Sequence, residues 1–175
     1  VFTNWLVGEV PTDLPMTSLR CGLDFGYAQD PAAAVLASFD PKYKRLYILR
    51  EFRQTGLTND LLAQKLLTLA GKLPITCDSA EPKSIAELRR LGVYALAAKK
   101  GPDSVLHGLQ WLNQQEIILS PACTHLREEL LNYRYLPDHE GGYLPRPTGP
   151  DHLIDALRYA MEGDSTARAA QAVKR

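Results

Sequence analysis

Three aspartates stand where short predicted elements end or begin. Asp24 ends an apolar run that starts at Leu19, Asp78 directly follows residues 75–77, and Asp155 lies one turn into the last predicted helix. Such ends are places where side chains from distant parts of a chain can converge in a cleft. Converging carboxylates repel one another unless cations lie between them, and oxygen ligands favour Mg²⁺ or Mn²⁺ over zinc. Two such ions about 4 Å apart can activate a water and stabilise the leaving oxygen of a phosphodiester.

Each of these acids also has an ordinary explanation. Asp155 alone is best explained as an acid at a helix start, which the helix dipole favours. The case for Asp78 is stronger, because an acid that abuts a buried strand needs a partner. From the residue types alone, a shared metal site and three separate surface acids remain equal alternatives.

Four further polar residues lie near these aspartates in the sequence. His152 and Asp155 are three residues apart and share one helix face, and an imidazole beside a carboxylate can ligate a metal or carry a proton. We expect Asp151 to cap the same helix. Asp30 and Glu81 each precede a proline, which also suits an ordinary turn and an ordinary helix start. We keep these last three acids as candidates for contacts beside the metal.

The predicted elements give a mixed sheet with helices on both faces, an α/β fold. Three apolar runs separated by turns indicate an antiparallel meander, and the rest of the chain alternates helices with short strands. If the first and fourth strands are neighbours, Asp24 and Asp78 face each other. Strands are predicted at 19–26, 32–39, 45–52, 75–78, 93–97 and 117–119, and helices at 57–73, 82–90, 102–114, 123–131 and 151–161, with a hairpin or long loop at 133–149.

Length and composition suit one domain with an ordinary core. The chain has 175 residues, of which 45% are hydrophobic, and its 20 basic and 20 acidic residues balance, so nucleic acid would have to be bound by a local basic patch. Cys21, Cys77 and Cys123 lack metal-binding spacing and indicate buried thiols in a reducing compartment. No apolar run approaches the roughly 20 residues that span a bilayer, so we expect no membrane partner. Residues 1–18 are predicted as an arm or linker, 19–163 as the domain, and 164–175 as a disordered tail.

Three ordered motifs resemble the nuclease domain of tailed-phage large terminases, within the RNase H-like superfamily. They are GLDFGYAQDPA at 22–32, CDSAEPKSI at 77–85 followed by LRRLG, and DHLIDALRY at 151–159. Lys99-Lys100-Gly101 with Ser104 also resembles a stretch of that family, and the likeness covers roughly residues 19 to 162.

The resemblance implies an RNase H-like fold and a divalent-metal-dependent endonuclease that cuts concatemeric double-stranded viral DNA during genome packaging. It implies that Asp24, Asp78 and Asp155 hold Mg²⁺ or Mn²⁺, as two ions, with His152 beside them in catalysis. The implied partners are the packaging ATPase domain, the small terminase and the portal protein, and the implied location is the host cytoplasm rather than the virion. The sequence contains no Walker A loop, so residues 1–18 are expected to come from the segment that joins a missing ATPase domain.

Basic residues near these motifs are candidates for sequence-independent contacts to DNA phosphates. We expect a role for Lys83, Lys99, Lys100, Arg134 and Arg146, and expect Arg89 and Arg90 to be a solvated helix face. Tyr133, Tyr135 and Tyr143 are expected to pack the hairpin onto the domain. Two other functions stay open: an RNase H-like nuclease of the resolvase type, and a docking module for portal or partner subunits whose nuclease activity is dormant.

Overall fold

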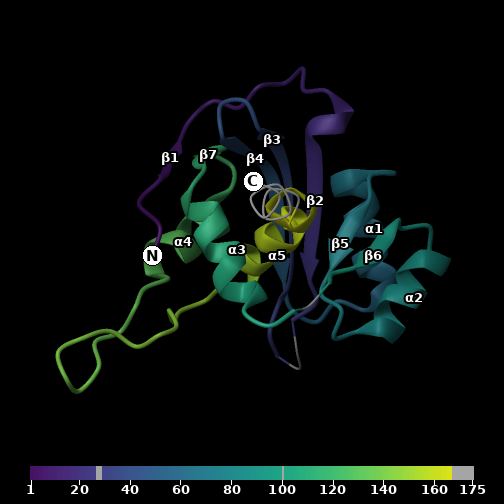
Figure 1. The fold of residues 1–175 in the computed structure, drawn as a ribbon. Helices are drawn as coiled ribbons and strands as arrows, with labels where there is room; N and C mark the ends of the chain where they lie inside the picture. The colour runs from purple at the N-terminus through teal and green to yellow at the C-terminus, as the bar shows by residue number, and fades with distance from the viewer. Residues whose placement is uncertain (27–28, 100, 167–175) are drawn as a thin grey trace.

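The computed structural model describes residues 1–26, 29–99 and 101–166. In this part of the chain seven strands form one mixed sheet in the order β1-β7-β4-β3-β2-β5-β6 (Figure 1). The predicted meander forms its antiparallel centre, and the remaining strands join in parallel. The strands are β1 (Trp5–Val7), β2 (Leu19–Asp24), β3 (Ala32–Asp40), β4 (Arg45–Gln54), β5 (Ile75–Cys77), β6 (Ala95–Ala97) and β7 (Glu116–Leu119).

The first and fourth predicted strands, β2 and β5, are neighbours, which the order of elements had left open. They run parallel, with Leu23 opposite Cys77, and the backbone N–H of Asp78 donates to the Leu23 carbonyl over 3.0 Å. The two strands therefore end side by side, which places Asp24 and Asp78 at the same edge of the sheet.

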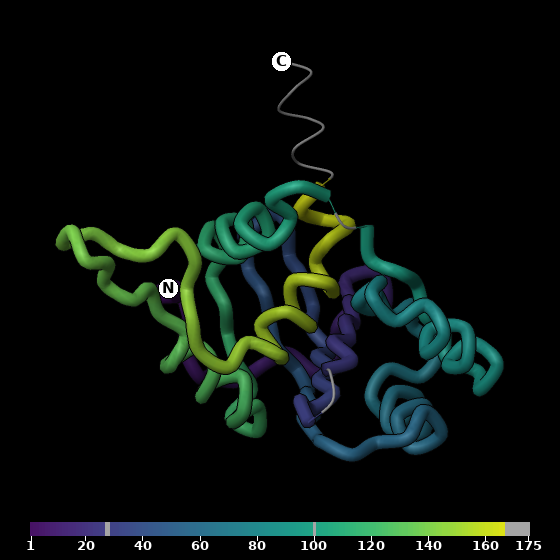
Figure 2. Tube along the Cα trace, turned by 90° about the horizontal axis from the view of Figure 1, so that it is seen from below, coloured from purple at the N-terminus to yellow at the C-terminus, as the bar shows by residue number. Residues whose placement is uncertain are grey.

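Helices cover both faces of the sheet, which confirms the predicted layers (Figures 1 and 2). Strand β3 is buried on both faces because its side chains alternate between two hydrophobic cores. One face packs against α3 (Ser104–Asn113), α4 (Thr124–Asn132) and α5 (His152–Ala160), and the other against α1 (Asn59–Ala70) and α2 (Pro82–Arg90). None of the described helices is long and apolar enough to cross a membrane.

Helix α5 packs directly on the backbone of β2 because Gly22 has no side chain. A Cβ atom at Gly22 would lie 1.9 Å from the carbonyl oxygen of Ala156 and 2.6 Å from the backbone nitrogen of Ala160. This close approach holds α5 across the sheet beside the ends of β2 and β5.

The three cysteines are free and buried, as expected, and they lie on both sides of the sheet. Cys21 and Cys77 belong to the core under α1 and α2, whereas Cys123 belongs to the core under α3, α4 and α5. Burial raises the pKa of the Cys77 and Cys123 thiols to about 12, so they stay protonated at neutral pH.

The segment 1–18, which we expected as an arm, packs against the domain and contributes the edge strand β1. Its Phe2 side chain is buried and stacks on Tyr133. The sequence did not reveal β1, because a strand of three residues is too short to show an alternating pattern. The structure describes residues 164–166 of the predicted tail, and Asp164 forms an ion pair with Arg20, with Oδ2 2.7 Å from Nε. Residues 167–175 lie outside the described part.

Residues 133–149 form the predicted hairpin, which projects from the body of the molecule (Figure 1). Isolated bridges join Arg134 to Thr148 and Pro137 to Tyr143. Tyr133, at its base, is buried as expected, but Tyr143 is 71% exposed, so the expectation that it packs the hairpin onto the domain is wrong. Its position near the hairpin tip leaves it without a core to join.

Candidate active site

Asp24 and Asp78 project toward the same face of the sheet. The preceding residues, Leu23 and Cys77, lie in the core beneath α1 and α2. Because side chains alternate along a strand, the two aspartates point to the opposite face, where α5 lies. The carboxyl ends of adjacent parallel strands thus deliver two carboxylates to the start of one helix.

His152, the first residue of α5, contacts the acid of β2. Its Nδ1 lies 3.1 Å from Oδ2 of Asp24, and its Nε2 lies 4.0 Å from Oδ1 of Asp30. The Asp24 side chain is only 14% exposed, and Asp30 is 60% exposed. Two of the sequence candidates, from segments more than a hundred residues apart, are therefore in direct contact.

Asp78 and Asp155 line one cleft of about 520 Å³ between α3, α5 and the end of β5. Asp155 also accepts a hydrogen bond from Nε of Arg158 over 3.2 Å. Lys99 lies on the rim of the same cleft, where its backbone N–H donates to the carboxylate of Glu162 over 2.7 Å.

The charges of these acids act on one another. Burial, together with the negative charges of Asp155 and Asp78, raises the pKa of Asp24 to about 6, although His152 opposes the rise. The carboxylates thus share an electrostatic environment that a cation would relieve. In the described conformation no group of three or more His, Cys, Asp or Glu side chains is close enough together to hold a metal ion.

The expectation that Asp151 caps α5 is wrong. Asp151 occupies the N-cap position, but its side chain makes no capping hydrogen bond. Glu129 of α4 instead accepts hydrogen bonds from the backbone N–H groups of Leu153 and Ile154. Sequence reasoning missed Glu129, although a signal was available. Glu129 lies on the same face of α4 as Leu126 and Leu130, and an acid on a face that is otherwise apolar and buried needs a partner.

The remaining acidic candidate and the basic candidates lie at different places. Glu81 precedes α2, with a proline at the first turn as expected, and its side chain does not cap that helix. Lys99 is at the cleft, whereas Lys83 is exposed on α2, and Arg134 and Arg146 are exposed on the hairpin. Lys100 lies outside the described residues.

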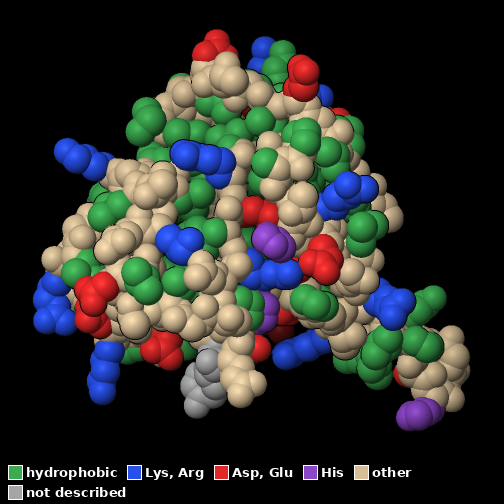
Figure 3. Space-filling model, turned by 180° about the vertical axis from the view of Figure 1, so that it is seen from behind, with side chains coloured by type: hydrophobic (Ala, Val, Ile, Leu, Met, Phe, Trp, Pro, Cys, Tyr) green, Lys and Arg blue, Asp and Glu red, His purple; other side chains and the backbone are tan. Residues whose placement is uncertain are grey.

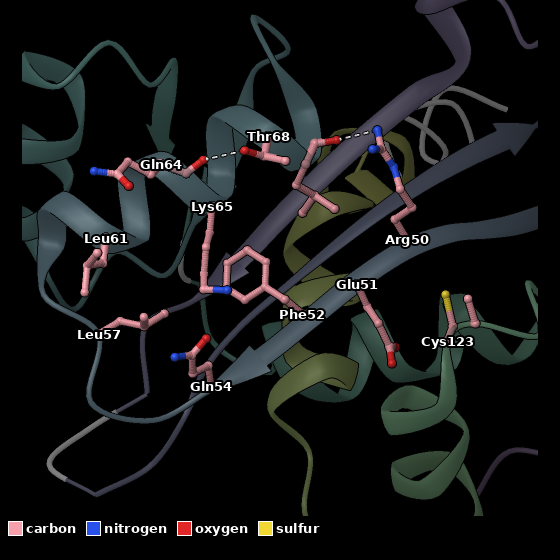
Figure 4. Close-up of a pocket in the computed structure, with 12 residues that line it drawn as sticks. Arg50, Glu51, Phe52, Gln54, Leu57, Leu61, Gln64, Lys65, Thr68 and Cys123 are labelled. Atoms are coloured by element: carbon pink, nitrogen blue, oxygen red, sulfur yellow. Dashed lines mark hydrogen bonds between the residues drawn. The ribbon is translucent and has the colours of Figure 1, made fainter.

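Another cavity lies away from these aspartates. It has a volume of about 640 Å³ and is formed by β4, α1 and the segment before α4 (Figure 4). Apolar side chains such as Phe52 and Leu61 line much of it, and Arg50 donates to the Leu69 carbonyl over 2.7 Å. Its one acid, Glu51, accepts backbone hydrogen bonds from the start of α4, so this cavity offers no cluster of carboxylates for metal chemistry.

Comparison with known proteins identifies the family of the chain. The family model described as "Terminase RNAseH like domain" matches residues 24–163. The large terminase subunit of Bacillus phage SPP1 is 38% identical over 156 residues, covering 84% of this chain and 36% of that protein. The PBSX phage terminase large subunit of Bacillus subtilis (strain 168) is 33% identical over 146 residues, covering 82% of this chain and 34% of that protein. The chain therefore spans about a third of the length of these relatives.

Solved structures show the same fold. The large terminase nuclease domain of bacteriophage SPP1, solved with bound Mn, has a TM-score of 0.83 at 35% identity, and the match covers 93% of this chain and 98% of that one. The P22 large terminase nuclease domain, at 16% identity and a TM-score of 0.69, shares the fold over 88% of this chain and 85% of that one. The chain belongs to the terminase RNase H-like domain family, and its seven-stranded sheet with helices on both faces is that of a large terminase nuclease domain.

Proposed function

We propose that this chain is a divalent-metal-dependent endonuclease that cleaves concatemeric double-stranded viral DNA during genome packaging in the host cytoplasm. The observation that carries the proposal is that the candidates lie in two pairs beside α5: Asp24 contacts His152, and Asp78 shares a cleft with Asp155. Carboxylates at adjacent strand ends, facing one helix, form a site of concentrated negative charge beside a basic rim.

The donor set fits Mg²⁺ or Mn²⁺. Asp24, Asp78 and Asp155 offer oxygen ligands, and His152 lies beside them. When bound, two such ions supply the charge that activates the attacking water and stabilises the departing 3′ oxygen. The SPP1 nuclease domain was solved with bound Mn, which supports a divalent ion in this family.

The chain's own residues position the reacting groups. Asp24 holds Nδ1 of His152, which leaves Nε2 as the atom that can accept or give a proton near the acids. Arg158 holds the Asp155 carboxylate, while Asp30, Glu81 and Asp151 are proposed to support the site from nearby.

DNA would be held through its phosphates. We assign this role to Lys83, Lys99, Lys100, Arg134 and Arg146, of which Lys99 lies on the rim of the acidic cleft. Because the chain spans about a third of its relatives, the ATPase domain, small terminase and portal protein are proposed as partners of the larger protein, with residues 1–18 leading from the ATPase domain into the nuclease domain at 19–163.

Plasmid nicking by the purified chain tests the proposal. Supercoiled plasmid is incubated with Mn²⁺ or Mg²⁺, and the Asp78→Ala variant serves as the control for contaminating nucleases. We expect cleavage by the parent to need the metal and Asp78→Ala to be inactive while its circular dichroism spectrum is unchanged. Equal cutting by both proteins removes the enzyme assignment, and inactivity of both favours a docking module whose nuclease is dormant.

The substrate separates the terminase from a resolvase-type nuclease. Linear duplex and four-way junctions of the same sequence are compared at equal enzyme concentration. The family membership leads us to expect cleavage of plain duplex, and a strong preference for the junction would favour the resolvase.

A further inference from the structure

The N-terminus of α5 is capped by a residue from another helix. The first four backbone N–H groups of a helix have no partner within it, and a side chain at the N-cap usually accepts from them. Asp151 does not do so here. Oε2 of Glu129 accepts from the N–H groups of Leu153 and Ile154, over 2.8 and 3.1 Å.

The other oxygen of Glu129 is also paired. Oε1 accepts from Nη1 of Arg53 over 3.1 Å, and Arg53 donates through Nη2 to Glu128 over 3.0 Å. The Glu129 side chain is 0% exposed. A buried carboxylate costs several kcal/mol of desolvation unless its oxygens are satisfied, and here the arginine and the positive end of the helix dipole satisfy both. Removing either partner leaves an unbalanced buried group.

This cap ties α5 to the rest of the fold at the point where the candidate site begins. A cap from Asp151 would hold the helix end only to itself, whereas Glu129 joins it to α4 and, through Arg53, to β4. His152 immediately precedes the two capped N–H groups, and Asp155 immediately follows them. Any shift of the capped turn therefore moves the side chains of His152 and Asp155.

Arg53 and His152 also line one recess, of about 560 Å³. On the face seen from behind, acidic, basic and histidine side chains gather near the centre (Figure 3). The cap is thus physically continuous with the candidate site rather than remote from it.

We propose that Glu129, held by Arg53, is a positioning residue of the nuclease site. It fixes the first turn of α5 so that His152 meets Asp24 and Asp155 faces the cleft shared with Asp78. The inference rests on the proposed nuclease function and adds to it a residue that touches neither metal nor DNA.

Glu129→Gln is the sharpest test because it keeps the shape of the side chain. The amide has one oxygen, so it can accept from the helix or from Arg53 but not from both, and its NH₂ group then faces a donor. We expect the Mn²⁺ concentration for half-maximal nicking to rise about tenfold, the usual size of such an effect around a metal site. We also expect the imidazole NMR signals of His152 to shift, measured with chelator at a temperature where the protein is fully folded.

The double variant Arg53→Met/Glu129→Gln tests the mechanism. Removing the buried charges as a pair leaves the Gln oxygen free to cap α5 without facing an arginine donor, and replacing a whole buried ion pair is often neutral for stability. We expect the Mn²⁺ requirement and the His152 signals to return toward those of the parent. A double variant that is as impaired as Glu129→Gln overturns the inference.

Glu51→Gln is the matched control. Glu51 is likewise buried and accepts from the N–H groups of His125 and Leu126 over 2.8 and 3.0 Å (Figure 4). It caps α4, which carries Glu129 but none of the candidate metal-binding aspartates. It should lower the melting temperature but leave the Mn²⁺ requirement unchanged. If both Gln variants raise that requirement equally, the effect is only loss of stability and the inference fails.

Two further outcomes keep the result decisive. If Glu129→Gln does not fold, Glu129→Asp takes its place: it keeps the charge beside Arg53 but withdraws the oxygens by one carbon–carbon bond, and it should show the same rise. A folded Glu129 variant with parental Mn²⁺ dependence overturns the inference. Active Asp78→Ala instead overturns the nuclease function itself, so the two failures are distinguishable.

Discussion

Asp24 is a candidate metal ligand whose pKa lies well above its ordinary value. Its side chain is only 14% exposed, and burial together with the charges of Asp155 and Asp78 raises its pKa to about 6. A folded-state pKa above the ordinary value of 3.8 means that the native state binds the proton more tightly than the unfolded state does. Without metal, the domain should therefore lose stability as the pH rises from about 4 through about 6, and stay at that lower level above.

Asp24→Asn should stabilise the domain in EDTA at pH 7.5, because the variant has no buried charge to desolvate. We expect a gain of roughly 1–2 kcal/mol in the free energy of unfolding, less than the full pKa shift because the contact with His152 is also lost. Urea denaturation at pH 7.5 and pH 4 measures it, and the difference between parent and variant should shrink at the lower pH. A variant less stable than the parent at pH 7.5 would contradict this assignment of the charge.

Helix α5 carries two of the candidate site residues, His152 and Asp155, and it packs against β2 too closely to admit a side chain at Gly22. The clash at position 22 is with backbone atoms of Ala156 and Ala160, which cannot rotate away. Gly22→Ala should therefore lift α5 from the sheet and cost on the order of 3 kcal/mol or more. Gly163→Ala is the matched control, since nothing lies within 4 Å of a Cβ there, and it should change stability by less than about 0.5 kcal/mol. Urea denaturation of both variants decides; equal stabilities would mean that α5 does not rest on Gly22.

Elements whose own residues specify them could be predicted, and those specified by distant residues could not. Strands β2, β3 and β4 and helices α1 to α5 all coincide with predicted runs, whereas the order of elements only allowed β2 and β5 to be neighbours. Local pattern could place Glu129 on a buried helix face but could not show which helix end it caps, so its role was missed and Asp151 was assigned in its place. Strand β1 was missed because it is specified by pairing with β7.

The same distinction holds for the candidate site. The motifs predicted that Asp24, Asp78 and Asp155 converge with His152 beside them. The structure brings His152 to Asp24 and places Asp78 and Asp155 in one cleft, a pairing that the sequence did not specify. The participation of Glu162 in that cleft was not anticipated, because a lone glutamate near a helix end is a common surface residue. Whether the aspartates bind metal stays a prediction.

At the scale of the whole molecule, acidic and basic residues balance, so DNA binding must depend on a few basic side chains at particular positions. Arg134 and Arg146 are exposed on the projecting hairpin. Alanine at either position should weaken binding of any duplex sequence and reduce the slope of log affinity against log salt by about one. Fluorescence anisotropy from 50 to 200 mM salt measures the slope. Arg90→Ala removes the same charge from the exposed end of α2 and should leave the slope unchanged; an equal effect there would mean that the loss reflects net charge rather than position.

The buried thiols on the two sides of the sheet allow the local opening of each layer to be measured separately. Cys21 and Cys77 sit beneath α1 and α2, and Cys123 sits beneath the layer that carries α5. A protonated, buried thiol reacts with an alkylating reagent only when the structure around it opens. The labelling rate at each cysteine therefore measures how often that side of the domain opens locally. If α5 and its companions open more readily than the opposite layer, Cys123 will be modified first, and ligands that bind beside α5 will slow that one reaction selectively.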